Sequence, residues 1–210
     1  MRVFNSRPFH FDSSDNLLTT NDYTCTGTQR CWDGKTFKQQ ADASHNIEKG
    51  PLALTAQNYP SVTSFVFTSC EWNGCSANLG GAISTSIRSI ELEVTKCQFL
   101  SCSSSGLYGG AIYAHFSSNI AVKNIFFHNC KSKGKNGNGD GGGAIFLDEI
   151  STQILISASD FVHCTANVDG GAVNIWNTYT NSNSPAIKDC HFVQCTITNS
   201  QLHEGVALLL

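Results

Sequence analysis

The sequence predicts an all-β fold, a parallel β-solenoid of about five to six coils. Two short motifs alternate along the chain at similar intervals, turn-forming residues such as Gly, Ser and Asn are frequent, and charged residues make up only 14% of the 210 residues. One copy of each motif makes up a repeat unit. Such a short unit cannot bury its hydrophobic face alone, so neighbouring units have to stack on one another. The chain is long enough for one domain with a sizeable core.

The first motif is a pair of glycines followed by alanine and an aliphatic residue. Glycine lets the backbone turn where a Cβ atom would collide, so we expect each pair to lie at a tight corner of a coil. The motif occurs four times and then once in a weaker form: Gly80-Gly81-Ala82-Ile83, Gly109-Gly110-Ala111-Ile112, Gly142-Gly143-Ala144-Ile145, Gly170-Gly171-Ala172-Val173 and Gly205-Val206-Ala207-Leu208.

The second motif is an aromatic residue three positions before a cysteine. Its five copies are Trp72 and Cys75, Phe99 and Cys102, Phe127 and Cys130, Phe161 and Cys164, and Phe192 and Cys195. Equivalent residues of stacked coils lie about 4.8 Å apart. We therefore expect the aromatic rings to stack as one interior ladder, and the cysteines to form a second ladder of small buried hydrophobic residues.

The spacing within a unit predicts a bend between two strands. Leu92 and Val94 share one face of a strand, and Cys97 and Phe99 share one face of the next strand. The step from Val94 to Cys97 is three residues, whereas strand faces repeat every two residues. The chain must therefore change direction between these two strands.

The repeats also suggest the organisation of the chain. Residues 1–49 contain no clear repeat, and we interpret them as an N-terminal region that would cap the open edge of the stack. Residues 50–210 are assigned to the solenoid. Because a glycine step begins a new coil just before Leu210, we expect this last coil to be incomplete and the chain to be part of a longer protein.

The two motifs resemble the Gly-Gly-Ala-Ile and Phe-x-x-Asn repeats of chlamydial polymorphic outer membrane proteins, and similar repeats in surface proteins of trichomonad parasites. The resemblance covers about residues 64 to 210, and cysteine replaces the asparagine in all five units. It implies a right-handed parallel β-helix that is displayed on a cell surface or secreted and that acts in adhesion, with a host or matrix protein or a glycan as its partner.

Composition narrows the remaining classes of function. A net charge of −3 and an isoelectric point near 6.1 provide no long-range attraction to nucleic acid. No apolar run is long enough for a transmembrane helix, and residues 1–5 lack the apolar stretch of a secretory signal. We therefore expect no nucleic-acid partner and no transmembrane segment in this chain, and the extracellular location is implied by the resemblance alone.

The ten cysteines raise the question of disulfides and metals. Side chains of an in-register ladder run parallel, which makes the disulfide torsion hard to reach, so the ladder cysteines are expected to be free thiols. Cys25 and Cys31 lie outside the repeats and are either paired or free. His128 and His163 should face away from the cysteine ladder, so we expect neither a metal site nor a cofactor.

A glycine-rich insertion is the leading candidate for a binding loop. It contains Lys131, Lys133, Lys135, Asn136, Asn138 and Asp140. The three lysines could bind an anionic glycan. The alternation of oxygen-bearing side chains resembles the start of a calcium loop, but the position that requires a bidentate Glu is occupied by Leu147, so we interpret the loop as a turn.

The leading interpretation is noncatalytic, and the alternative is a polysaccharide-degrading lyase or inverting hydrolase. If Ser159, Phe161, Cys190 and Phe192 point inward, the side chains of Asp160, Asp189 and His191 point outward on neighbouring coils. Two residues along a strand and one coil up correspond to about 8 Å, which suits the acid and base of an inverting glycosidase. Release of saccharide by the purified protein would distinguish the enzyme from a binding protein.

Overall fold

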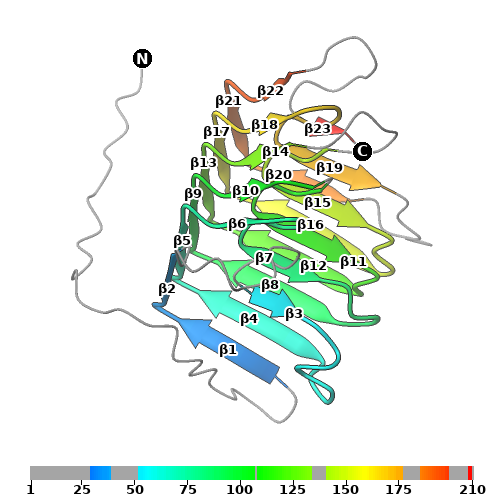
Figure 1. Ribbon diagram of the computed structural model, residues 1–210. Helices are drawn as coiled ribbons and strands as arrows, with labels where there is room; N and C mark the ends of the chain where they lie inside the picture. The colour runs from blue at the N-terminus through cyan, green and yellow to red at the C-terminus, as the bar shows by residue number, and fades with distance from the viewer. Residues whose placement is uncertain are drawn as a thin grey trace.

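The protein is a parallel β-solenoid of about four turns (Figure 1). The computed structural model describes residues 29–38, 52–106, 108–133, 141–176, 185–198 and 208–209, and these ranges contain strands and turns but no helix. The predicted all-β solenoid is confirmed. The predicted number of coils was slightly too high, because the turns at the two ends are incomplete within the described ranges.

Four parallel sheets, A to D, run along the solenoid. Sheet A consists of β1 (Gln29–Asp33), β4 (Ser64–Thr68), β8 (Glu91–Thr95), β12 (Asn119–Lys123), β16 (Gln153–Ser157) and β20 (Ala186–Lys188). Sheet B consists of β2 (Thr36–Lys38), β5 (Glu71–Asn73), β9 (Gln98–Leu100), β13 (Phe126–His128), β17 (Asp160–Val162) and β21 (His191–Val193).

The other two sheets complete each turn. Sheet D consists of β6 (Ser76–Ala77), β10 (Ser103–Ser104), β14 (Lys131–Ser132), β18 (Thr165–Ala166) and β22 (Thr196–Ile197). Sheet C consists of β3 (Leu52–Leu54), β7 (Ile83–Thr85), β11 (Ile112–His115), β15 (Ile145–Asp148), β19 (Val173–Trp176) and β23 (Leu208–Leu209). The chain therefore passes through sheets A, B, D and C in that order before it begins the next turn.

An aromatic ladder fills the interior behind sheet B. Consecutive ring centroids are 4.6 to 4.9 Å apart and the ring planes differ by 4 to 11°. Its six members are Phe37, Trp72, Phe99, Phe127, Phe161 and Phe192. The five predicted members are confirmed. Phe37 was missed because Gln40, and not cysteine, stands three residues after it.

Part of the N-terminal region belongs to the sheets. Strands β1 and β2 lie within residues 1–49 and pair in parallel with β4 and β5. Trp32 of β1 stacks on Phe67 with ring centroids 4.4 Å apart. The remainder of residues 1–49 lies outside the described ranges, so the cap stays a prediction.

The predicted cysteine ladder lies at the corner that follows sheet B. Its members, Cys75, Cys102, Cys130, Cys164 and Cys195, are buried free thiols. Each Sγ atom donates to the carbonyl oxygen of the aromatic residue of the preceding turn, at 3.3 to 4.0 Å. Burial raises the pKa of the Cys130 thiol, which keeps it protonated and unreactive. Cys31 is disulfide-bonded, and its candidate partner Cys25 lies outside the described ranges.

We expect thiol labelling of the native protein to follow burial. Cys102, Cys130 and Cys164 have no exposed surface, whereas Cys190 is only partly buried. Cys190 should therefore react first with a maleimide reagent, and the other three should react only when the solenoid opens. Peptide mass spectrometry after timed labelling measures this order. Equal rates for Cys130 in buffer and in denaturant would contradict the inward assignment of the cysteine ladder.

Left-handed residues turn the corners between the strands. The corner between sheets A and B has a positive φ angle in each of five turns: Ser69, Lys96, Asn124, Ala158 and Asp189, at 48 to 55°. This conformation supplies the predicted three-residue step, because one residue leaves the strand geometry between two inward-facing positions. The first glycine of each pair, such as Gly109 at φ 55°, turns the corner before sheet C.

Ala158 tests the cost of this corner. It is exposed, and its φ angle of 48° disfavours a residue with a Cβ atom. Ala158→Gly should therefore raise the free energy of unfolding by about 1 kcal/mol, since the left-handed conformation costs L-residues about 1–2 kcal/mol. The control Ala121→Gly, on the outer face of β12, should lower it. Urea denaturation of both variants measures the two signs, and a loss of stability in Ala158→Gly would contradict this account.

No helix within the described ranges is long and apolar enough to cross a membrane.

The glycine-rich insertion is described only at its start, where Lys131 and Lys133 are exposed on either side of the buried Ser132. Lys135, Asn136, Asn138 and Asp140 lie outside the described residues.

Candidate functional site

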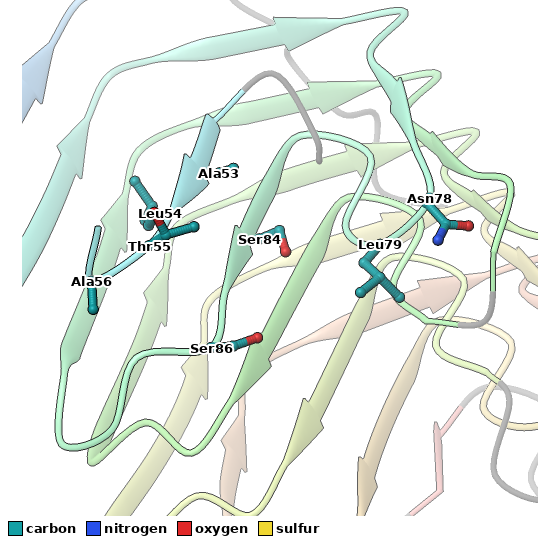
Figure 2. A pocket seen from close by; sticks show the side chains of 8 residues that line it. All are labelled: Ala53, Leu54, Thr55, Ala56, Asn78, Leu79, Ser84 and Ser86. Atoms are coloured by element: carbon teal, nitrogen blue, oxygen red, sulfur yellow. The ribbon is translucent and has the colours of Figure 1, made fainter. Parts of the chain in front are cut away.

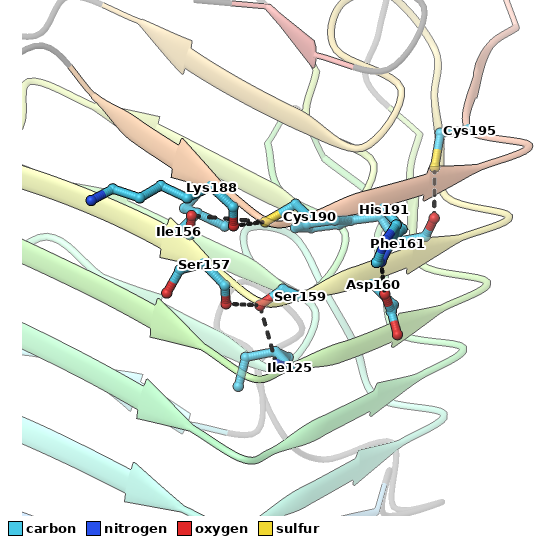
Figure 3. Close-up of polar contacts among 10 residues, drawn as sticks. All are labelled: Ile125, Ile156, Ser157, Ser159, Asp160, Phe161, Lys188, Cys190, His191 and Cys195. Carbon is cyan, nitrogen blue, oxygen red and sulfur yellow. Dashed lines mark hydrogen bonds and ion pairs between the residues drawn. The ribbon is translucent and has the colours of Figure 1, made fainter. Parts of the chain in front are cut away.

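The outer face of sheet B brings together two of the three side chains named in the enzyme hypothesis, in direct contact and not at the predicted spacing of about 8 Å. Asp160 of β17 and His191 of β21 are in register on neighbouring strands. His191 Nδ1 lies 2.9 Å from Asp160 Oδ1, and Figure 3 marks this contact with a dashed line. The side chain of His191 is 67% exposed and that of Asp160 is 46% exposed, so water reaches both. The pair can hold a proton between its two groups, but it lies on an open surface.

Asp189 is not part of this contact. It occupies the left-handed corner before β21, with φ 53°, and it is exposed. The predicted spacing of about 8 Å assumed that Asp189 and His191 belong to one straight strand. The structure brings Asp160 and His191 together and places Asp189 at the corner.

The inward assignments behind this geometry are confirmed. Ser159 and Phe161 are fully buried, and Phe192 belongs to the aromatic ladder. Ser159 Oγ donates to the Ser157 carbonyl at 2.8 Å and accepts from the Ile125 amide at 3.1 Å (Figure 3). Ser159 occupies the corner position at which other turns have a cysteine. Its two hydrogen bonds satisfy the hydroxyl group at that buried position.

A second feature of sheet B is an apolar surface, here called the sheet B patch. It consists of Leu100, Phe126, His128, Val162 and Val193. Phe126 is 36% exposed and Val193 is 47% exposed. The ring of Phe126 stacks on that of His128 with centroids 5.8 Å apart. Four neighbouring strands thus present a flat, partly apolar face to solvent.

The outer face of sheet C combines aromatic and charged side chains in one row. His115, Asp148 and Trp176 are in register on β11, β15 and β19. His115 Nε2 lies 3.5 Å from Asp148 Oδ2, and Asp148 Oδ1 is buried with no hydrogen-bond partner. Trp176 is 42% exposed. Burial raises the pKa of the Asp148 carboxyl, although the nearby His115 opposes the shift.

Tyrosines border this row on the same sheet. Tyr113, two residues before His115, is 5% exposed and stacks with Tyr108 at a centroid distance of 5.5 Å. Burial raises the pKa of Tyr113 to about 12, with a smaller contribution from the charge of Asp148. Tyr113 therefore remains a neutral hydroxyl at physiological pH.

A depression of about 320 Å³ lies on sheet C beside β3 and β7 (Figure 2). Small outward residues of β3 and β7, Ala53 and Ser84, leave this space. Its polar lining comes from Thr55, Asn78, Ser84 and Ser86. The depression contains hydroxyl and amide groups but no charged side chain.

The sequence does contain a signal for the row on sheet C. His115, Asp148 and Trp176 each stand three residues after the aliphatic position of a glycine motif, as Ser86 does. The repeat pattern does not predict a site at this position, because the residue type there changes from unit to unit. The sheet B patch was missed for the same reason.

Within the described ranges, no group of three or more His, Cys, Asp or Glu side chains converges as metal ligands would. No protein-family model, no curated protein and no solved structure matches this chain. The functional assignment therefore depends on the surfaces themselves.

Proposed function

We propose that this chain is a noncatalytic segment of a cell-surface or secreted protein that acts in adhesion or ligand binding. The sheet B patch supports this proposal, because it exposes Phe126 and Val193 to water on a flat face. A bound partner would cover these apolar side chains. Exposed apolar groups with polar neighbours are typical of surfaces that bind another protein. A host or matrix protein is the proposed partner of this face.

The place of the chain among repeat proteins is part of the same proposal. The ladders and glycine corners are compatible with the repeats of polymorphic outer membrane proteins, in which display on a cell surface would explain an open binding face. Replacement of their Asn by Cys is accommodated here, since each thiol finds a backbone carbonyl acceptor. On this basis we propose a right-handed coil and an extracellular location.

Binding to cells and matrix tests the proposal. The labelled protein is applied to epithelial monolayers and to immobilised fibronectin, laminin and collagen, and bound protein is measured against concentration. Phe126→Ser combined with Val193→Ser should weaken binding by about tenfold or more, as expected for central interface residues. The control Leu155→Ser, half-buried on the outer face of sheet A, should bind normally. The proposal would be refuted if the double variant bound as tightly as the unmodified protein, or if the unmodified protein did not bind at all.

The enzyme alternative is favoured by one observation, the contact of 2.9 Å between Asp160 and His191. An acid and a base in direct contact leave no room between them for the attacking water of an inverting glycosidase, so the pair would have to act as one proton-transfer unit on a polysaccharide chain lying across sheet B. Against this, both side chains are largely hydrated, and catalytic electrostatics is strongest where water is excluded. A reducing-sugar assay on pectin, xylan and alginate decides between the two: release that disappears in Asp160→Ala would establish the enzyme.

A further inference from the structure

We propose that the outer face of sheet C is a second binding site, for a neutral oligosaccharide that lies along the solenoid axis. The site consists of the sheet C row, defined as His115, Asp148 and Trp176, and the depression beside β3 and β7. It is formed by a different sheet from the sheet B patch. Its failure would leave the proposed function untouched, and the converse also holds.

Trp176 provides the surface on which a sugar ring would stack. Among the three tryptophans, Trp32 and Trp72 are 4% and 0% exposed, whereas Trp176 is 42% exposed. The face of an indole ring is electron-rich and apolar, and it favours contact with weakly positive C–H groups. One face of a pyranose presents several axial C–H groups, so it matches an exposed tryptophan better than an extended peptide does.

The neighbouring positions of the row provide hydrogen bonds at the rim of that sugar ring. Asp148 is directly in register with Trp176, and His115 is in register with Asp148. Asp148 Oδ1 has no partner, and a rotation about the Cβ–Cγ bond would turn it toward a ligand hydroxyl. A buried acceptor without a partner is costly, so a donor from the ligand would recover that energy. A carboxylate with a vicinal hydroxyl pair is a strong interaction of this kind.

The carboxylates at the centre of the row disfavour acidic glycans, although Arg88 lies over the Phe116 ring that stacks on His115 at one side of it. Asp148 and the adjacent Glu149 add negative charge to the row, and the depression has no charged lining to compensate an anion. Like charges in partly buried positions repel strongly, because little water screens them. A neutral saccharide avoids this repulsion and still offers donors to the carboxylates.

The length of the site indicates an oligosaccharide and not a single sugar. Trp176 lies three strands along sheet C from Ser84, through β15 and β11. At about 4.8 Å per strand this is about 14 Å, which exceeds one sugar ring. The hydroxyls of Thr55, Ser84 and Ser86 and the amide of Asn78 would then bind the sugar at the other end. Figure 2 shows these polar groups around the depression.

Tryptophan fluorescence tests the proposal directly, because Trp176 is the one tryptophan that solvent reaches. The protein is titrated with cellohexaose, xylohexaose, mannohexaose and the hexamer of N-acetylglucosamine, and with hyaluronan hexasaccharide as the acidic probe. We expect at least one neutral hexasaccharide to shift the emission to the blue and to protect it from acrylamide. Its monosaccharide should bind at least about tenfold more weakly, since it reaches one end of the site only.

Two variants assign the binding to the row, with affinity measured by calorimetry. Trp176→Ala and Asp148→Asn should each weaken binding by about tenfold or more. Asp148→Asn should keep the melting temperature, because it removes a carboxylate that burial disfavours and so separates lost binding from lost folding. Phe126→Ala on sheet B is the control and should bind the saccharide normally. The proposal fails if only hyaluronan binds, if no probe binds, or if Trp176→Ala binds unchanged.

Discussion

Gly143→Ala is expected to reduce the free energy of unfolding by at least about 3 kcal/mol, because a Cβ atom has no space there. It would lie 2.0 Å from the carbonyl oxygen of Gly171 in the next turn and 2.7 Å from backbone atoms of Thr165. These are backbone atoms of a neighbouring coil, so relief would require the two coils to separate. Chemical denaturation followed by circular dichroism measures the loss.

A second glycine distinguishes close packing from backbone conformation. Gly74 has φ 67°, and a Cβ atom there would meet nothing within 4 Å. Gly74→Ala should therefore lose only the left-handed penalty of about 1–2 kcal/mol. If the two variants lost equal stability, contact between coils would not be the reason for the second glycine of the motif.

Phe127→Ala is expected to cost about 3–5 kcal/mol, the range found when a large aromatic residue is removed from a packed core. Phe127 is fully buried between Phe99 and Phe161, with ring centroids 4.9 and 4.8 Å away. The neighbouring rings are attached to strands that are hydrogen-bonded in register, so they cannot close the cavity without breaking the sheets. Thermal or urea unfolding gives the difference from the unmodified protein.

The matched control for this variant is Lys133→Ala. Lys133 is exposed beside sheet D, and its removal should change stability by less than about 0.5 kcal/mol. Phe127→Leu should fall between the two, because leucine fills part of the space but cannot stack with the adjacent rings. Similar stabilities for Phe127→Ala and Lys133→Ala would mean that the aromatic ladder does not support the fold.

The sequence by itself determined the fold class and the inward faces of the strands. Residues such as Phe99, Phe127 and Cys130 are constrained by burial in every coil, so the same residue type has to return at the same place in each repeat. The glycine pairs are constrained in the same way by contact between coils, as Gly110 and Gly143 illustrate. Constraint repeated coil after coil is what makes a pattern visible in one sequence.

Only the tertiary structure decided which outward residues become neighbours. His115, Asp148 and Trp176 form one row because strands of successive coils pair in register, yet solvent imposes no common residue type on them, so the sequence pattern does not mark them. Asp189 was expected on a strand and lies at a left-handed corner, because alternation of faces cannot locate the residue at which a strand begins. Burial restricts the residue types of the interior, so the local sequence shows which residues point inward. Which residues are neighbours on the outer surface depends on contacts between residues about one coil apart.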